Sequence, residues 1–277
     1  MKKTKRYSTA LTIAGSDSGG CAGIQADLKT FSSLGVFGMS AITAITAQNT
    51  SEVRAIENLS LEIIKKQLEA VLDDITIDAV KTGMLPSVEI IEVVASIIDK
   101  YSLSTVIVDP VMVATSGSRL TSSSVISAFS HYLYSRITLI TPNIPEAEAL
   151  SGIKIHSEKD MYKAAYILLA QGCPAVLIKG GHSQSSDSTD TLFRPDKEPV
   201  RFSISRIDSH NLHGTGCTFS SAIAAYMALD HDIENSIRLA KNYISSAIDA
   251  GKDISTGKGF GPVNHSFEPK PLNIKTI

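Results

Sequence analysis

The chain has 277 residues, of which 43% are hydrophobic and 19% charged, a composition that excludes a disordered or low-complexity protein and predicts a sizeable core. A formal net charge of −2 leaves no basic excess for a phosphate backbone, so nucleic-acid binding is disfavoured. Three scattered cysteines, Cys21, Cys173 and Cys217, form no disulfide framework and no metal-binding pair, which is typical of a cytoplasmic protein. No apolar run reaches the roughly 18 residues of a membrane span, so no membrane partner is expected.

Apolar runs of β type alternate with longer helical patterns along the chain. After a basic segment, residues 1–8, that we expect to be a loose tail, the predicted strands are Ala10–Ala14, Ser40–Thr46, Ile77–Thr82, Thr105–Asp109, Ile137–Thr141 and Ala175–Lys179. The predicted helices are Ile24–Leu34, Leu61–Asp74, Val88–Lys100, Ser122–Leu133, Pro145–Leu150, Glu158–Gln171, Thr218–Ala228 and Ile233–Ala250. This alternation indicates one α/β domain over residues 1–277, with a mainly parallel sheet covered by helices on both faces.

The alternation of predicted strands and helices is interrupted late in the chain. Ser183–Ser188 is serine-rich and is expected to be a mobile loop, whereas Thr191–Arg194 and Val200–Ile207 flank a Pro-Asp-Lys-Glu-Pro turn and predict a hairpin. A hairpin at this point argues against a TIM barrel, in which each strand should be followed by a helix.

Unusual polar or glycine residues follow nearly every predicted strand. In chain order they are Gly15, Gln48, Gly83-Met84, Asp109, Asn143 and Lys179-Gly180-Gly181. Ligands bind at the carboxyl ends of the strands in open parallel α/β sheets, so six such segments together predict a cleft.

The turn Gly214-Thr215-Gly216-Cys217 opens a predicted helix. Its glycines let backbone amides converge on one point, which suits an anion, and the same field favours a Cys217 thiolate with a lowered pKa. Two other interpretations stay open: a glycine-rich helix start with an inert buried cysteine, and a cysteine hydrolase built on Cys217 and His213.

Four further residues have both a structural and a functional interpretation. Asn143 and Glu146 have the spacing of a capping box, and Glu146 could also face a hydrated Mg²⁺ together with Asp109. Lys179 precedes two glycines, which allows close approach to a phosphate. No P-loop, Gly-x-Ser-x-Gly elbow or dinucleotide-binding glycine motif occurs.

The ordered set of these motifs resembles hydroxymethylpyrimidine/phosphomethylpyrimidine kinases from about residue 10 to about residue 265. The resemblance is carried by residues 14–20, 22–30, 46–50, 81–85, 109–112, 141–143, 179–182, 213–218 and 261–265. It implies a ribokinase-like three-layer α/β/α sandwich, a cytoplasmic homodimer, and ATP- and Mg²⁺-dependent phosphorylation of 4-amino-5-hydroxymethyl-2-methylpyrimidine and then of its monophosphate, in thiamine biosynthesis. Cys21 departs from the usual glycine of the first loop.

The resemblance also implies a role for each matching position. Gly15, Asp27, Gln48, Met84 and Val111 would surround the pyrimidine; Asn143, Lys179, Gly181, Thr215 and Gly216 would bind ATP; Asp109 and Glu146 would hold Mg²⁺. Gly214, Thr215, Gly216 and Lys179 would stabilise the transferring phosphoryl group, with Cys217 as the base for the substrate hydroxyl. A vitamin B6 kinase on the same fold and a pyrimidine-binding sensor without activity are the alternatives.

Overall fold

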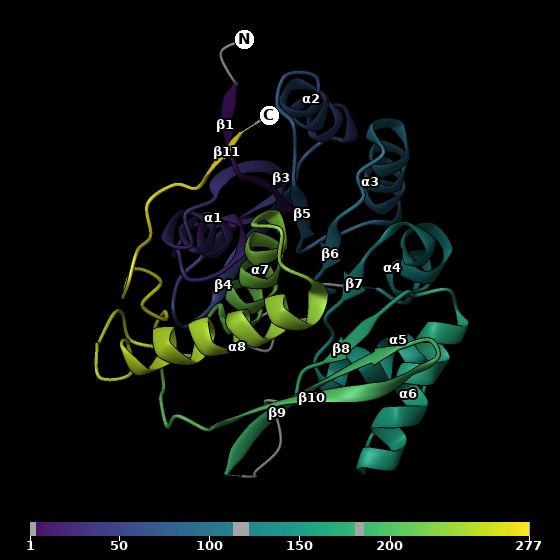
Figure 1. The fold of residues 1–277 in the computed structure, drawn as a ribbon, viewed down its shortest axis with the longest axis vertical. Helices are drawn as coiled ribbons and strands as arrows, with labels where there is room; N and C mark the ends of the chain where they lie inside the picture. The colour runs from purple at the N-terminus through teal and green to yellow at the C-terminus, as the bar shows by residue number, and fades with distance from the viewer. Residues whose placement is uncertain (1–3, 113–121, 181–185, 277) are drawn as a thin grey trace.

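The computed structural model describes residues 4–112, 122–180 and 186–276, and within them one large sheet forms the middle of the molecule (Figure 1). Its strand order is β10-β9-β8-β7-β6-β5-β2-β3-β4. The strands are β2 (Thr9–Asp17), β3 (Phe37–Gln48), β4 (Val53–Asn58), β5 (Ala79–Thr82), β6 (Val106–Val108), β7 (Leu139–Ile140), β8 (Val176–Ile178), β9 (Asp187–Arg194) and β10 (Lys197–Ser205).

The inner strands pair in parallel, from β3 through β2, β5, β6 and β7 to β8. β4, β9 and β10 pair antiparallel at the two sides of this parallel block. The inner strands β5 to β8 are fully buried along their described length, as the continuous apolar runs of the sequence predict.

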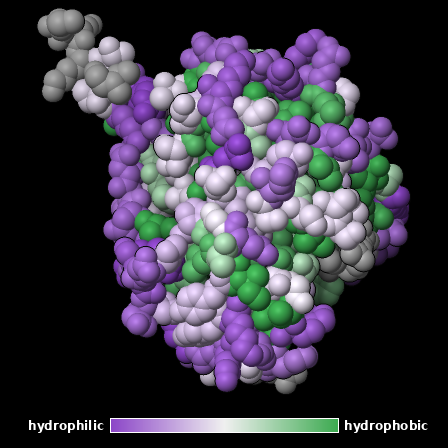
Figure 2. All heavy atoms as spheres, turned by 90° about the vertical axis from the view of Figure 1, so that its right-hand side faces the viewer, coloured by the Kyte–Doolittle hydropathy of each residue, from purple (hydrophilic) through white to green (hydrophobic). Residues whose placement is uncertain are grey.

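Helices cover both faces of the sheet, which confirms the predicted three-layer α/β/α arrangement. Helices α1 (Gly23–Ser33), α7 (Thr215–Ala228) and α8 (Ile233–Asp249) contribute to one core cluster. Helices α2 (Leu61–Leu72), α3 (Val88–Tyr101), α4 (Ser123–Ala128), α5 (Ile144–Ser151) and α6 (Glu158–Ala170) lie over the other. On this second side, small hydrophobic groups lie scattered among hydrophilic residues (Figure 2).

Several expected elements differ in detail. β2 and β3 run further than predicted, β9 takes in Asp187 and Ser188 of the expected serine-rich loop, and the end of the fourth helix is a π-helix, Phe129–Leu133, followed by a short 3₁₀ turn, Tyr134–Arg136. β4 was not predicted, because most of its side chains are exposed and its sequence therefore contains no apolar run. Among the described residues, no helix is both long and apolar enough to cross a membrane.

The expectation of a loose N-terminal tail is wrong for the residues described. β1 (Lys5–Tyr7) pairs antiparallel with β11 (Ile274–Thr276), so the first and last described strands lie side by side (Figure 1). Asp78, just before β5, ties both strands to the sheet: Arg6 donates to its two oxygens at 2.7 and 2.6 Å, and Lys275 donates at 3.2 Å.

Asp78→Asn should therefore lower stability in a pH-dependent way. Burial alone would raise the pKa of Asp78, but the hydrogen bonds from Arg6, Thr9 and Lys275 outweigh it and lower the pKa to about 2. A lowered pKa contributes stability above the unfolded value near 4, and the contribution is lost as the pH falls toward 2. Urea unfolding should show wild type more stable at pH 7, with the difference closing in acid. A difference independent of pH would contradict this assignment.

Candidate active site

A cavity of about 960 Å³ lies at the carboxyl ends of the parallel strands, as the positions of the polar residues predicted. Its walls come from the ends of β2, β3, β5, β6 and β8 and from the first turns of α5 and α7. The predicted site residues that line it are Gly15, Gln48, Met84, Asp109, Val111, Asn143, Glu146, Lys179, Gly214, Thr215, Gly216 and Cys217. Gly181 lies outside the described residues.

Asp27 is the predicted site residue that the structure keeps away from this lining. Its side chain is fully buried on α1, where Lys81 donates to both carboxylate oxygens at 2.9 Å. Thr12 and Ser221 donate at 2.5 and 2.6 Å. With four internal hydrogen bonds, its carboxylate has an internal structural role in place of the expected pyrimidine contact.

Gly15, Met84 and Gln48 form one end of the cavity. A Cβ at position 15 would lie 2.8 Å from the Met84 Cε atom, so the glycine makes room for the methionine that forms the wall. The Gln48 amide nitrogen lies 2.9 Å from Nε2 of His213. A side-chain amide both donates and accepts, which suits the edge of an aminopyrimidine ring.

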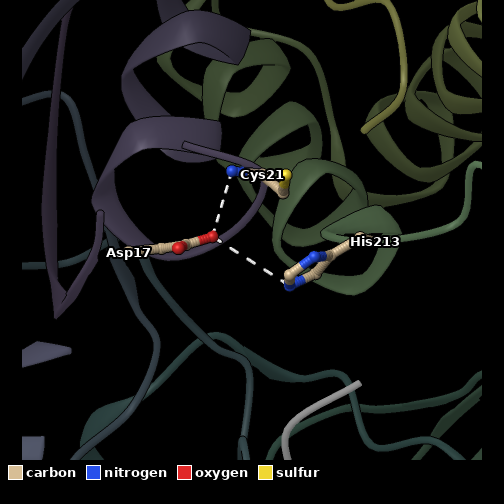
Figure 3. Close-up of side chains that lie close together, drawn as sticks. All are labelled: Asp17, Cys21 and His213. Atoms are coloured by element: carbon tan, nitrogen blue, oxygen red, sulfur yellow. Dashed lines mark hydrogen bonds and ion pairs between the residues drawn. The ribbon is translucent and has the colours of Figure 1, made fainter. Parts of the chain in front are cut away.

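His213 and Asp17 also line this end, and Cys21 lies beside them (Figure 3). Asp17 accepts backbone amide hydrogen bonds from Gly19, Cys21 and Ala22 at 2.8, 3.0 and 2.8 Å, which holds the loop between β2 and α1. Nε2 of His213 lies 4.0 Å from the Asp17 carboxylate. Because His213 faces Gln48 and Asp17, its described contacts give no support to the Cys217–His213 hydrolase.

Cys21, which stands where the family usually has glycine, makes its hydrogen bonds within the loop between β2 and α1. Its thiol is buried 3.6 Å from the Gly19 carbonyl, and burial followed by the charge of Asp17 raises its pKa, so it is a poor nucleophile. Its carbonyl oxygen packs against Gly214, where a Cβ would lie only 1.8 Å away. Gly214 also has φ +81°, so both space and backbone conformation require glycine there.

The other end of the cavity carries the anion-binding features. Gly214 is the N-cap of α7 and offers no side chain to cap it. The first amides of a helix have no carbonyl partner within it, and although the Thr215 amide donates to the Leu212 carbonyl at 3.3 Å, the turn Gly214–Cys217 can direct others toward an anion. The helix begins at Thr215, three residues earlier than predicted, and Cys217 lies inside its first turn.

The expected low pKa of Cys217 is wrong for this arrangement. Burial raises the pKa of its thiol to about 11, and Asp27 and Asp109 act in the same direction. Lys81 and a hydrogen bond from the Gly23 amide oppose the rise without cancelling it. Desolvation of the thiolate is the largest cause of the raised pKa, although Cys217 is only half-buried in the cavity wall.

Lys179 and two carboxylates lie next to the turn. Nζ of Lys179 donates to Asp109 at 2.8 Å, and Ser220 of α7 donates to the other Asp109 oxygen at 3.3 Å. Burial alone would lower the pKa of Lys179, but the charges of Asp109 and Glu146 outweigh it, so the lysine is a fixed cation.

The capping box at the start of α5 is confirmed. Asn143 accepts from the Glu146 amide at 2.9 Å, and Glu146 accepts from the Asn143 amide at 2.8 Å. Burial first, and then the charge of Asp109, raises the pKa of Glu146 to about 7. Two carboxylates that repel each other in a buried site fit a divalent cation, because its charge relieves the repulsion.

Sequence reasoning missed the wall contributed by the β9–β10 hairpin and α8. Lys241 is buried there, donating to Asp190 at 2.6 Å and to Ser188 at 2.9 Å, while Asp190 accepts from the Gly180 amide at 2.9 Å. A lysine on the apolar face of an amphipathic helix is the one signal that could have found it. Further lining residues from this wall are Ile204, Ser205, Arg206, Ile207, Ile244, Ser245 and Ile248.

A glycine turn at a helix N-terminus, a fixed lysine and two carboxylates over a parallel sheet suit phosphoryl transfer and place the chain among the α/β kinases. The family model described as phosphomethylpyrimidine kinase matches residues 17–264, and the chain belongs to that family. It is 44% identical over 265 residues to the hydroxymethylpyrimidine/phosphomethylpyrimidine kinase of Bacillus subtilis, covering 95% of this chain and 97% of the relative.

Two solved structures that are similar to this chain come from kinases with different substrates. The phosphomethylpyrimidine kinase of Clostridium difficile is 46% identical, with 87% of this chain and 99% of that chain covered and a TM-score of 0.76. The pyridoxal kinase of Bacillus subtilis, solved as an ADP complex, is 37% identical, with 94% and 98% covered and a TM-score of 0.86. Overall shape therefore does not separate pyrimidine from pyridoxal enzymes, and sequence identity is higher toward the pyrimidine kinases.

Proposed function

We propose that the protein uses ATP and Mg²⁺ to phosphorylate 4-amino-5-hydroxymethyl-2-methylpyrimidine and then its monophosphate, in thiamine biosynthesis. The observation that carries the proposal is one cavity with two chemically different ends. Gln48 and Met84 suit a flat, polar-edged ring at one end, while Lys179 and the turn Gly214–Cys217 suit a phosphoryl group at the other. A cytoplasmic homodimer, as the family resemblance implies, belongs to the same proposal.

In the first step, the substrate hydroxyl oxygen bonds to the γ-phosphorus as the bond to the β–γ bridging oxygen breaks, leaving ADP. The hydroxyl proton passes to the Cys217 sulfur when that sulfur is a thiolate, and later to solvent. Amides of Gly214 and Gly216 donate to the transferring oxygens, joined by the Thr215 amide only if it gives up its hydrogen bond to the Leu212 carbonyl, and Lys179 neutralises their charge. Positioning carries most of the catalysis, because a loose transition state needs little covalent help.

Asp109 and Glu146 are the residues that would hold Mg²⁺, largely through water. When bound, the ion supplies charge neutralisation between the phosphate groups of ATP. Asp109 and Glu146 both line the cavity, and the charge of Asp109 adds to burial in raising the pKa of Glu146, so a bound cation would favour the ionised form of both carboxylates.

Incubation with ATP and each candidate alcohol, with and without Mg²⁺, tests the proposal. Formation of ADP together with the pyrimidine monophosphate and then the diphosphate, followed by ³¹P NMR, is the expected result. Formation of ADP only with pyridoxal would replace the proposal with the vitamin B6 kinase. A protein that binds the pyrimidine without any transfer would instead be a sensor.

A vitamin B6 kinase is the second candidate, and the pyridoxal kinase neighbour of TM-score 0.86 favours it. Pyridoxal lacks the amino group beside a ring nitrogen that Gln48 would contact in the pyrimidine. The ratio of kcat/KM for the two alcohols is therefore the measurement that separates the two kinases.

Gln48→Ala should weaken pyrimidine binding by roughly 1–3 kcal/mol, because it leaves polar ligand atoms and Nε2 of His213 without their partner. Titration calorimetry with the pyrimidine alcohol measures the loss. Asn49→Ala is the matched control, since Asn49 accepts hydrogen bonds from its own turn, at Ser51 and Glu52. Unchanged affinity in Gln48→Ala would make Gln48 a structural strand-end residue.

A further inference from the structure

A buried ion pair lies beneath the site and takes no part in the function described so far. Lys81 on β5 and Asp27 on α1 are both completely buried, and the ammonium donates to both carboxylate oxygens at 2.9 Å. Removing two charges from water costs several kcal/mol for each ion, and a well-packed apolar pair is often no less stable. A contribution to the free energy of unfolding therefore does not by itself explain why this ion pair is present.

The ammonium lies directly under the cavity. Gly83, two residues after Lys81 on the same side of the chain, lines the cavity. A Cβ at position 83 would lie 3.0 Å from Nζ of Lys81. The same point lies 2.8 Å from the Ala14 side chain, so Gly83 and Ala14 together form the cavity wall next to this charge.

Helix α7 connects the ion pair to the reacting end of the cavity. Ser221 donates to Asp27 at 2.6 Å, and it lies one turn after Cys217 on the same side of the helix. The hydroxyl of the preceding residue, Ser220, lies within hydrogen-bond distance of Asp109 at 3.3 Å and of the Gly216 carbonyl of its own helix at 3.0 Å. Two consecutive serines therefore join the first turns of α7 to two ion pairs, Lys81–Asp27 and Lys179–Asp109.

Cys217 faces charged groups from four elements. Lys81 comes from β5, Asp27 from α1, Asp109 from the end of β6 and Lys179 from the end of β8, while the Gly23 amide donates to the sulfur. After burial, Lys81 has the largest influence on the pKa of Cys217 and lowers it, while Asp27 and Asp109 raise it less. The ammonium end of the buried pair thus acts on the sulfur more strongly than the carboxylate end.

We propose that Lys81 is a positioning residue of the kinase: it holds Asp27 in place, and through the hydrogen bond from Ser221 to Asp27 it fixes the first turns of α7, which carry Cys217, against the cavity. Lys81 exchanges no proton and touches no substrate. The inference rests on the proposed function, because it gives Cys217 and the α7 amides a part in phosphoryl transfer.

The double variant Lys81→Met/Asp27→Asn tests the proposal, because it removes both charges while keeping the volumes and an acceptor for Ser221. We expect a folded protein with nearly unchanged KM for the pyrimidine and kcat reduced by at least about tenfold. Iodoacetamide alkylation of Cys217, followed by mass spectrometry over a range of pH, should show its inflection raised by roughly one unit. Arg6→Met/Asp78→Asn removes an ion pair far from the cavity and serves as the control.

Each outcome separates the hypotheses. Wild-type kcat together with an unchanged alkylation inflection overturns the role of Lys81. Alkylation needs no turnover, so a shifted inflection in a protein that phosphorylates neither alcohol would reject the proposed function while leaving the charge effect of Lys81 intact. If the double variant does not fold, Ser221→Ala keeps both charges and removes only the bond between α7 and Asp27. Lower kcat at unchanged KM then supports the proposal, and unchanged kcat overturns it.

Discussion

Lys179→Ala should reduce turnover by about 10²–10³-fold while leaving pyrimidine binding nearly intact. The ammonium lies at the phosphoryl end of the cavity, 2.8 Å from Asp109 and away from the Gln48 end. Its loss removes the fixed cation next to the glycine turn. The positive charge of Lys179 also lowers the pKa of Glu146. Without that charge the pKa of Glu146 should rise further, so Glu146 should become protonated at neutral pH.

Single-turnover kinetics and pyrimidine titration together measure this prediction. Lys66→Ala is the control, because Lys66 is an exposed lysine of α2 that pairs only with Glu62 in the described contacts. Weaker pyrimidine binding with an unchanged rate per bound complex would reject the phosphate role of Lys179. A parallel loss of thermal stability in Lys179→Ala would show that the ion pair with Asp109 also supports the fold.

Substitution of Cys217 separates its three interpretations. If the sulfur is the base, Cys217→Ser should lose activity, because a serine hydroxyl hardly ionises near neutral pH, and Cys217→Asp should recover part of it. A hydrolase nucleophile loses activity in both variants, because neither carries a thiolate. A purely structural cysteine tolerates serine and suffers from aspartate, whose charge is costly to bury.

The pH dependence of kcat is the decisive measurement, with ATP and the pyrimidine alcohol saturating. A base must lose its proton before it acts, and burial raises the pKa of Cys217 to about 11, so wild-type kcat should rise with pH across the neutral range. In Cys217→Asp this rise should move to lower pH, because a carboxyl ionises more readily than a thiol. Wild-type-like turnover in Cys217→Ser would leave the amides of the turn as its only catalytic contribution.

Local sequence patterns determined the sheet and the position of the cavity. Continuous apolar strands such as Val176–Ile178 must be buried on both faces, and parallel strands bring their carboxyl ends to one edge. Gln48, Asp109, Asn143 and Lys179 follow such strands, so their order along the chain was enough to predict that they meet. The capping box of α5 is equally local, since it needs only a spacing of three residues.

Contacts between distant residues and burial were decided only by the tertiary structure. Asp27 looked like a surface charge or a ligand contact, but it pairs with Lys81, 54 residues away, and no local pattern specifies that pairing. Arg6 and Lys275, at opposite ends of the chain, likewise meet at Asp78. For Cys217 the sequence showed a helix N-terminus that favours a thiolate, whereas in the folded chain the half-buried thiol lies in the cavity wall, where desolvation raises its pKa. The free energy of a charge depends on everything packed around it, and that surrounding exists only once the fold has formed.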